Sequence, residues 1–288
     1  MADVVEGHRP SRSPEELAAQ LADRAEELEP LTASLPDRPG NLVELGAEAL
    51  AVAGLRTLLD GDVATPLRIA ARAVAAAGVL LGLDAPLQVA LGGPGPVTLP
   101  LLAARPVGLG PRSLVQATHA ALATRDTVAL ELFAAVPIER TAREPVSAEE
   151  AAYGLAHARG LQLLLRGDAA GNDLLLEALQ GCTDGGLHPA ARDYALFLVS
   201  PEIELTLGHL QPGGDQFDQS LRNALTLHRR YWTEVEANPG EPQDNDPAGF
   251  IALGPLAWAA LRHDHGLPSA VRSDYLPASV IAGSAPAP

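Results

Sequence analysis

Side chains that could perform acid–base chemistry are concentrated late in the chain. His228, Tyr231 and Trp232 lie within five residues of one another, and Asp274 is followed directly by Tyr275. Histidines, carboxylates and phenols are groups that enzymes use to move protons. If the protein is an enzyme, His228, Tyr231, Asp274 and Tyr275 are therefore its catalytic candidates.

The spacing of apolar residues offers a structural reading of the same residues. One stripe recurs at helical intervals and contains Phe217, Leu221, Leu225, His228 and Trp232. A histidine on such a stripe is better explained as part of a buried core than as a catalyst. Asp274 is likewise better explained as the cap of a turn, and Tyr275 as an inserted ring with a bonded hydroxyl. We favour this reading and predict no catalytic residue.

Two histidines near the end of the chain resemble metal ligands by type. His263 and His265 flank Asp264, but positions i and i+2 of a helix point to different faces. Cys182, the only cysteine, excludes a disulfide framework and a zinc site built from several cysteines. We prefer a turn position for Cys182 over a nucleophile assisted by His188. The sequence therefore predicts neither a metal nor a cofactor.

A glycine- and proline-rich segment interrupts the helical pattern in the first half. The runs 87–91 and 97–101 flank it, and they predict a small β-hairpin packed on the helices. A phosphate-binding loop is the alternative. Pro94 and Pro96 lack the N–H donors that a phosphate needs, and no Gly-Lys-Ser/Thr follows. We reject the phosphate loop.

The rest of the chain predicts helices joined by short turns. Ser13 and Pro14 begin a first helix that should end near Pro30. Three helical hairpins follow, each with an aspartate able to cap its second helix, and they join 42–59 to 66–83, 112–124 to 127–136, and 148–165 to 169–180. The fold class predicted is all-α, an irregular array of helical hairpins with one small β-hairpin insertion.

The last third should contain four further helices. One begins at Pro189 and breaks near Pro201, a second runs over 202–210, and a third over 217–232. Asp246 and Pro247 begin the fourth, which Pro255 should kink or restart. We expect one helical domain over residues 14–278, a disordered segment 1–13 and a flexible tail 279–288.

Composition limits the classes of partner. The net charge is −16, and all 20 basic residues are arginine, which is typical of a GC-rich genome. An acidic surface repels phosphate backbones, so nucleic acid is not expected as a partner. No apolar run is long enough to span a bilayer, and the segment 1–16 has no apolar signal core. We therefore expect a cytoplasmic protein without a membrane partner.

One acidic segment stands out as a candidate surface for a basic protein partner. Residues 234–246 include two prolines and no basic residue, which predicts an exposed loop. Its five acids are the candidate partner-binding residues: Glu234, Glu236, Glu241, Asp244 and Asp246. A solvated loop without a role is the alternative.

Four segments in the last third carry a family resemblance. They are Pro201-Glu-Ile-Glu-Leu205, Ala224-Leu-Thr-Leu-His-Arg-Arg-Tyr-Trp-Thr233, Gly249-Phe-Ile-Ala-Leu-Gly-Pro-Leu-Ala257 and Ser273-Asp-Tyr-Leu-Pro277. In their order and spacing they resemble the closing signature of the immunity protein 49 family, over about residues 188–278. The resemblance implies a mostly helical protein, encoded near a toxin, that protects the producing cell by binding that toxin in the cytosol.

Two functional hypotheses remain open from the sequence. The first is an immunity protein that performs no chemistry and binds one toxin. The second is an enzyme or small-molecule-binding protein of an actinobacterial biosynthetic pathway on the same helical fold. A deep pocket lined by the four catalytic candidates would favour the enzyme, and a filled core with a broad acidic face would favour the inhibitor.

Overall fold

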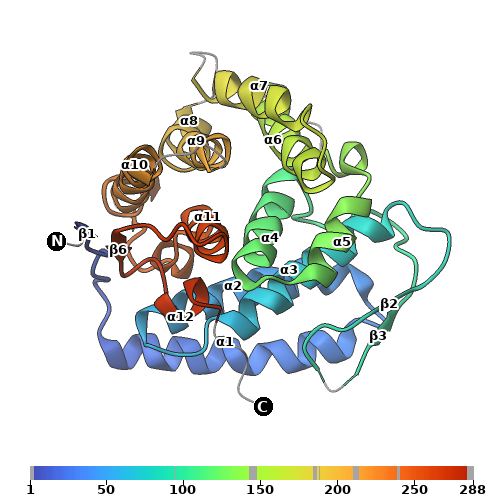
Figure 1. Cartoon of the computed structure of the whole chain (residues 1–288). Helices are drawn as coiled ribbons and strands as arrows, with labels where there is room; N and C mark the ends of the chain where they lie inside the picture. The colour runs from blue at the N-terminus through green and yellow to red at the C-terminus, as the bar shows by residue number, and fades with distance from the viewer. Residues whose placement is uncertain are drawn as a thin grey trace.

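The computed structural model describes residues 3–93, 95–142, 148–183, 187, 189–209, 214–238 and 241–283. Helices make up 67% of the structure and strands 5%. This confirms the predicted all-α class. Figure 1 shows the helices arranged around a central region, with α1 (Pro14–Ser34) along one side and α11 (Leu253–Asp264) near the middle.

The three predicted helical hairpins are present. Their helices are α2 (Leu42–Leu58) with α3 (Ala64–Leu80), α4 (Pro111–Thr124) with α5 (Thr127–Ala135), and α6 (Ala148–Leu165) with α7 (Gly171–Thr183). The aspartate in each turn accepts a hydrogen bond from a backbone N–H group near the start of the second helix, and Asp126 is the N-cap residue of α5. The carboxylates of Asp62, Asp126 and Asp168 accept from the N–H groups of Ala64, Ala129 and Ala170 at 3.0–3.1 Å.

Helix α1 begins as predicted and ends later than predicted. The Ser13 hydroxyl accepts from the Glu16 N–H, and the Glu16 carboxylate accepts from the Ser13 N–H, which is a complete capping box. The helix does not end near Pro30 but continues to Ser34. Leu28 and Leu31, on either side of the proline, pack against the core. This packing compensates for the one backbone hydrogen bond that Pro30 cannot donate.

Helix α3 is the centre of the core. Every residue from Ala73 to Leu80 is buried, and the helix contacts α2, α4 and α5. Its run of alanines lets neighbouring helices approach closely, because small side chains occupy little of the space between backbones. The predicted β-hairpin lies beside it as β2 (Leu87–Val89) and β3 (Val97–Leu99), paired antiparallel. Pro94 lies outside the described residues.

The segment after α7 differs from the predicted pair of separate helices. Helix α8 (Pro189–Tyr194) continues through one π-helical segment, η3 (Ala195–Val199), into α9 (Ser200–Gly208). Pro201 therefore does not break the helix. A wider turn just before a proline moves the preceding carbonyls away from its ring, which an ordinary α-turn would not allow. His188 lies outside the described residues.

The chain then returns to the centre of the molecule. Helix α10 (Gly214–Glu234) leads to a short hairpin of β4 (Glu236–Asn238) and β5 (Glu241–Pro242). Asp246 caps the 3₁₀ turn η4 (Pro247–Phe250), and the chain is extended at Ile251 before α11 begins. The single apolar helix predicted after Asp246 is therefore two elements, with Pro255 in the first turn of the second. Helix α11 packs against α4.

Both ends of the described chain are more ordered than expected. Strand β1 (Asp3–Val5) pairs in parallel with β6 (Val271–Ser273), and His8 is buried. The disorder expected for residues 1–13 is thus wrong from Asp3 onward, because β6 supplies hydrogen-bond partners that the sequence pattern did not reveal. Residues 278–281 form the short helix α12. Across the described residues, no helix has the length and apolar character needed to cross a membrane.

Candidate functional site

A cavity of about 750 Å³ lies among α2, α4, α6, α9, α10 and η4. Apolar side chains from several helices line it, including Val43, Leu50, Val115, Leu198 and Ile251. Polar and charged groups interrupt this apolar lining at a few points. The volume and the mixture of groups are those of a small-molecule site.

Glu202 on α9 is one of the charged residues in the wall. Its side chain is 22% exposed, and this exposed part faces the cavity, since the residue is otherwise enclosed by protein. Burial raises the pKa of Glu202 to about 8, although Arg112 and the Gly254 N–H act to lower it. The carboxyl group is therefore largely neutral near pH 7.

Gly254 on α11 leaves the space that this carboxyl group needs. A Cβ at position 254 would lie 2.5 Å from Glu202 Cγ and 2.6 Å from Glu202 Oε1. Real Cβ atoms do not approach other atoms so closely. Glu202 and Gly254 belong to two different segments of the resemblance, Pro201–Leu205 and Gly249–Ala257, and the structure brings these segments into contact.

Two buried histidines lie in the same wall, and one of them is close to Glu202. His119 on α4 places its Nδ1 3.9 Å from Glu202 Oε2, and its ring centroid is 6.2 Å from that of His157 on α6. Burial lowers the pKa of His119 to about 4 and that of His157 to about 3. Both rings are therefore neutral near pH 7. Among the described residues, neither Nε2 atom has a hydrogen-bond partner.

Arg112 supplies a positive charge to the same wall. Its guanidinium carbon lies 3.9 Å from the centroid of the Tyr194 ring, a cation–π contact that fixes its orientation. The Arg112 side chain is exposed, and it is a cavity residue. Across the described residues, no carboxylate lies within 4.0 Å of its guanidinium group. Burial raises the pKa of Tyr194 to about 12, so its hydroxyl remains protonated.

His228 and Trp232 lie at the end of the cavity formed by α10 and η4. Trp232 is buried, as its position on the apolar stripe predicts. His228 Nε2 lies 3.0 Å from the Gly249 carbonyl oxygen, and its ring centroid lies 4.8 Å from that of Tyr275. Burial lowers the pKa of His228 to about 4. A neutral imidazole donating to a backbone carbonyl fits a packing role in this position.

The four catalytic candidates do not converge on one point. His228 contacts Tyr275, but only His228 among the four lines the cavity. The Tyr275 hydroxyl accepts from the His8 N–H at 2.8 Å. The exposed Asp274 carboxylate accepts from the Gly7 N–H at 3.0 Å. Tyr231 instead packs edge to face with Tyr194 and Trp232.

The N-terminal segment completes this part of the structure. The His8 side chain lies within hydrogen-bonding distance of two groups, with Nδ1 2.9 Å from the Tyr275 hydroxyl and Nε2 3.1 Å from the Asp244 carbonyl oxygen. One residue near the start of the chain thus connects two segments near its end. No sequence pattern predicts this contact, because His8 lies in a polar stretch without periodicity.

His263, His265 and Cys182 do not have the surroundings of metal ligands or of a nucleophile. His263 Nδ1 lies 3.8 Å from Asp264, whereas His265 Nδ1 lies 2.8 Å from the Leu261 carbonyl. Within the described ranges, no three side chains of metal-ligand type come together. Cys182 is 1% exposed, and burial raises the pKa of its thiol to about 12. A protonated thiol of this kind is a poor nucleophile.

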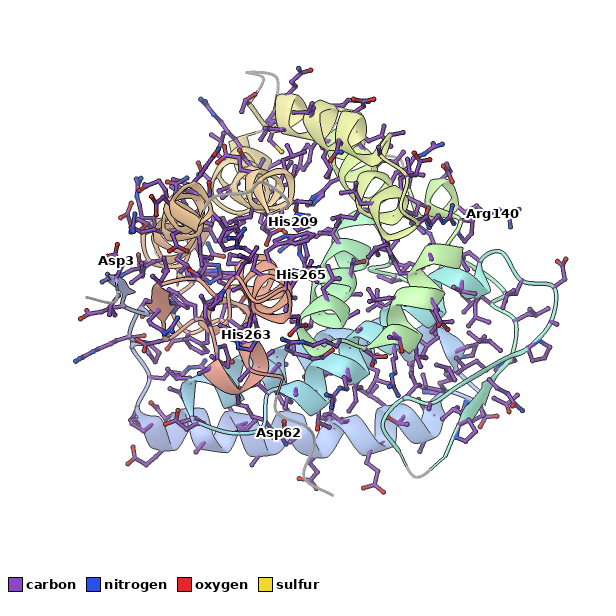
Figure 2. All side chains as sticks on the ribbon, viewed as in Figure 1. Asp3, Asp62, Arg140, His209, His263 and His265 are labelled. Atoms are coloured by element: carbon purple, nitrogen blue, oxygen red, sulfur yellow. The ribbon has the colours of Figure 1, made fainter. Side chains whose placement is uncertain are left out.

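A second aromatic contact lies next to this region. His209 lies between α9 and α11 (Figure 2), where its ring centroid is 4.3 Å from that of Trp258. Trp258 in turn packs edge to face with His119. The cavity histidine is thus held in place by aromatic packing from α11.

The five acidic residues have different surroundings. Glu234 forms an ion pair with Arg230 at 3.0 Å. The Asp244 carboxylate accepts from the Asn245 side chain at 2.9 Å, and Asp246 accepts from the Ala248 N–H at 2.9 Å. Glu236 is exposed and lies on β4, opposite β5, where Glu241 lies. The side chain of Glu241 is outside the described residues. The expected loop is thus partly a hairpin.

The main cavity residues were not identified from the sequence. Arg112 and His119 are seven residues apart on α4, but no spacing rule connects them to His157 on α6 or to Glu202 on α9. One signal was available: His119 and His157 lie on helices rich in alanine and leucine, which favours burial of a histidine on the apolar face. That signal indicates burial but not which buried residues meet.

The helical array places the chain among all-α proteins. The family model of immunity protein 49 matches residues 60–280. The chain therefore belongs to the immunity protein 49 family, and the match extends well upstream of the segments that carry the resemblance. The chain matches no curated protein and no solved structure.

Proposed function

We propose that the protein is an immunity protein that binds and neutralises a cognate bacterial toxin in the cytosol of the cell that makes it. Membership of the immunity protein 49 family over residues 60–280 is the observation that carries this proposal. The enzyme alternative has weaker support, because His228, Tyr231, Asp274 and Tyr275 do not share one site.

The partner is proposed to be a basic protein. The net charge of −16 favours association with a positively charged surface. The proposed contact region is the β4–β5 hairpin with its flanks, and it contains Glu234, Glu236, Glu241, Asp244 and Asp246. Asp246 also caps η4, so its replacement would disturb the fold as well as the charge. The other four acids are therefore the better targets for substitution.

The experiment measures binding to the toxin encoded beside this gene. Glu234, Glu236, Glu241 and Asp244 are replaced together by glutamine or asparagine. Charges at the rim of an interface mainly accelerate association. We therefore expect the association rate to fall several-fold at low salt and much less at about 0.15 M salt, where screening acts beyond about 8 Å. The dissociation rate should change little.

The matched control removes four acids from a distant surface. Asp23, Glu26, Glu27 and Glu29 lie on the exposed face of α1. If both variants slow association equally, net charge steers the encounter and the hairpin is not the contact region. If the wild-type protein does not bind the toxin at all, the proposed function itself is wrong.

A further inference from the structure

The cavity contains polar groups that the fold itself does not satisfy. His119 Nε2, His157 Nε2 and Trp232 Nε1 are buried and have no hydrogen-bond partner among the described residues. All three residues line the cavity. A buried polar group without a partner costs about 1–3 kcal/mol. These three atoms belong to residues of the cavity wall, whereas the unpaired nitrogens of Arg222, Trp258 and Arg262 belong to residues outside it.

Other buried histidines in the same region show the contrast. The ring nitrogens of His8 lie within hydrogen-bonding distance of Tyr275 and Asp244, and His228 has the Gly249 carbonyl oxygen as its partner. The ring nitrogens of His8 and the Nε2 atom of His228 thus have hydrogen-bond partners within the protein, and both rings act in packing. His119 and His157 differ from them, although they are buried to a similar extent.

The charge balance of the wall selects the kind of occupant. Arg24 and Glu48 pair with each other at 2.6 Å, and Asp246 is engaged by the Ala248 N–H. Glu202 is largely protonated near neutral pH. Arg112 is then the one charged cavity side chain, among those the structure describes, that has no charged or capping partner. A guanidinium group held in this way recognises carboxylates and phosphates.

We propose that this cavity is a binding site for a small organic anion, whose acidic group pairs with Arg112 and whose apolar body lies against Val43, Leu50, Val115 and Leu198. The rings of His119 and His157 form part of the same wall. The anionic group is a carboxylate or a phosphate, and both can bind an arginine in bidentate fashion. This site adjoins the acidic surface proposed for the toxin, since Asp246 belongs to both.

The test uses two fluorescent probes that differ in charge. Anilinonaphthalene sulfonate carries an anionic group on an aromatic body, and N-phenylnaphthylamine is its neutral counterpart. We expect the wild-type protein to bind the sulfonate at one site and about tenfold more tightly than the neutral probe, since one charge-assisted contact contributes about 1.4 kcal/mol or more. Octanoate and octyl phosphate are then added as competitors. The one that displaces the probe identifies the anionic group, and failure of both contradicts the proposal.

Three variants locate the site. Arg112→Gln should weaken binding of the sulfonate about tenfold and leave the neutral probe nearly unaffected. Arg38→Gln, which changes an exposed arginine outside the cavity, should alter neither. Ala51→Phe places a ring into the cavity from α2 and should abolish binding of both probes. If Arg112→Gln does not fold, Ala51→Phe alone tests where the probes bind. Undiminished binding of the sulfonate by a folded Arg112→Gln variant, or any binding of it by a folded Ala51→Phe variant, would overturn the proposal.

Discussion

The Glu202 side chain fills the space that a side chain at position 254 would need. A methyl group at position 254 would lie 2.5 Å from Glu202 Cγ. The pairing joins the start of α11 to α9 at the edge of the cavity. It also explains why a glycine follows Leu253 at the start of α11.

Gly254→Ala should therefore destabilise the protein. The added methyl group must displace the Glu202 side chain, and overpacking of this kind costs about 1–3 kcal/mol. The free energy of unfolding from urea titration measures the effect. In the double variant with Glu202→Ala, the clash is removed, so the two effects should be clearly non-additive. Strict additivity would mean that the two residues do not compete for space.

The raised pKa of Glu202 predicts a pH dependence of stability. The group has an ordinary value of 4.5 and a folded value of about 8, so the folded state holds the proton more tightly. The protonated Glu202 carboxyl group therefore stabilises the folded state fully below about pH 4.5, and this stabilisation is lost as the pH rises to about 8. Glu202→Gln removes this pH-dependent loss of stability, because the amide group does not ionise. The variant should thus gain about 2–4 kcal/mol relative to the wild type between pH 5 and pH 8.

Comparison of the two proteins at each pH isolates this effect. His119 and His157 have lowered pKa values, so their contribution is lost as the pH falls below about 6.5, and it is common to both proteins. Glu26→Gln, an exposed change on α1, is the control and should follow the wild-type curve. Parallel curves for wild type and Glu202→Gln would show that the carboxyl group is not buried in its neutral form.

Arg125 connects the α4–α5 turn to the C-terminal elements. Its guanidinium group donates to both oxygens of Asp264 at 2.8 Å and to the Ile281 carbonyl at 2.7 Å. Arg125→Ala should lower the free energy of unfolding by about 2–3 kcal/mol, since charge-assisted bonds of this kind contribute that order. Arg125→Lys should recover less than half, because an ammonium group cannot reproduce the planar fork. If Arg125→Lys had the wild-type free energy of unfolding, the positive charge of Arg125 would matter and its planar geometry would not.

Trp232 is expected to contribute strongly to stability. It is 5% exposed and packs against Gly249 and the rings of His228 and Tyr231. Trp232→Ala should cost about 3–5 kcal/mol, as other large-to-small core substitutions do. Trp232→Phe should cost less, because it keeps most of the ring. A thermal melt of both variants checks the order, and an unchanged melting temperature for the alanine variant would contradict the packing seen here.

The fold was predictable where local signals agree. The Ser13 cap and the Asp62, Asp126 and Asp168 turns are short-range patterns, and each specifies a helix start from a few neighbouring residues. The continuation of α1 through Pro30 and of α8 into α9 through Pro201 was not predictable in this way. In α1, tertiary packing outweighs the local cost of the proline, and before Pro201 a π-turn makes room for it.

The site was less predictable than the fold, because its residues are distant in the sequence. The apolar stripe correctly indicated that Trp232 is buried. The contact between Glu202 and His119, and the position of Arg112 over Tyr194, depend on how α4, α9 and η3 pack. Likewise, β1 is ordered only because β6 lies beside it. Single-sequence periodicity contains no information about such pairings.

Protection of living cells tests the central claim most directly. The toxin encoded beside this gene is expressed from an inducible promoter in a bacterial host, with and without this protein. We expect growth to be restored when wild-type protein is present, and the two proteins to purify as one complex. The toxin alone should stop growth. If cells expressing both proteins die as fast as cells expressing the toxin alone, while this protein accumulates in folded form, it does not neutralise that toxin and the account is contradicted.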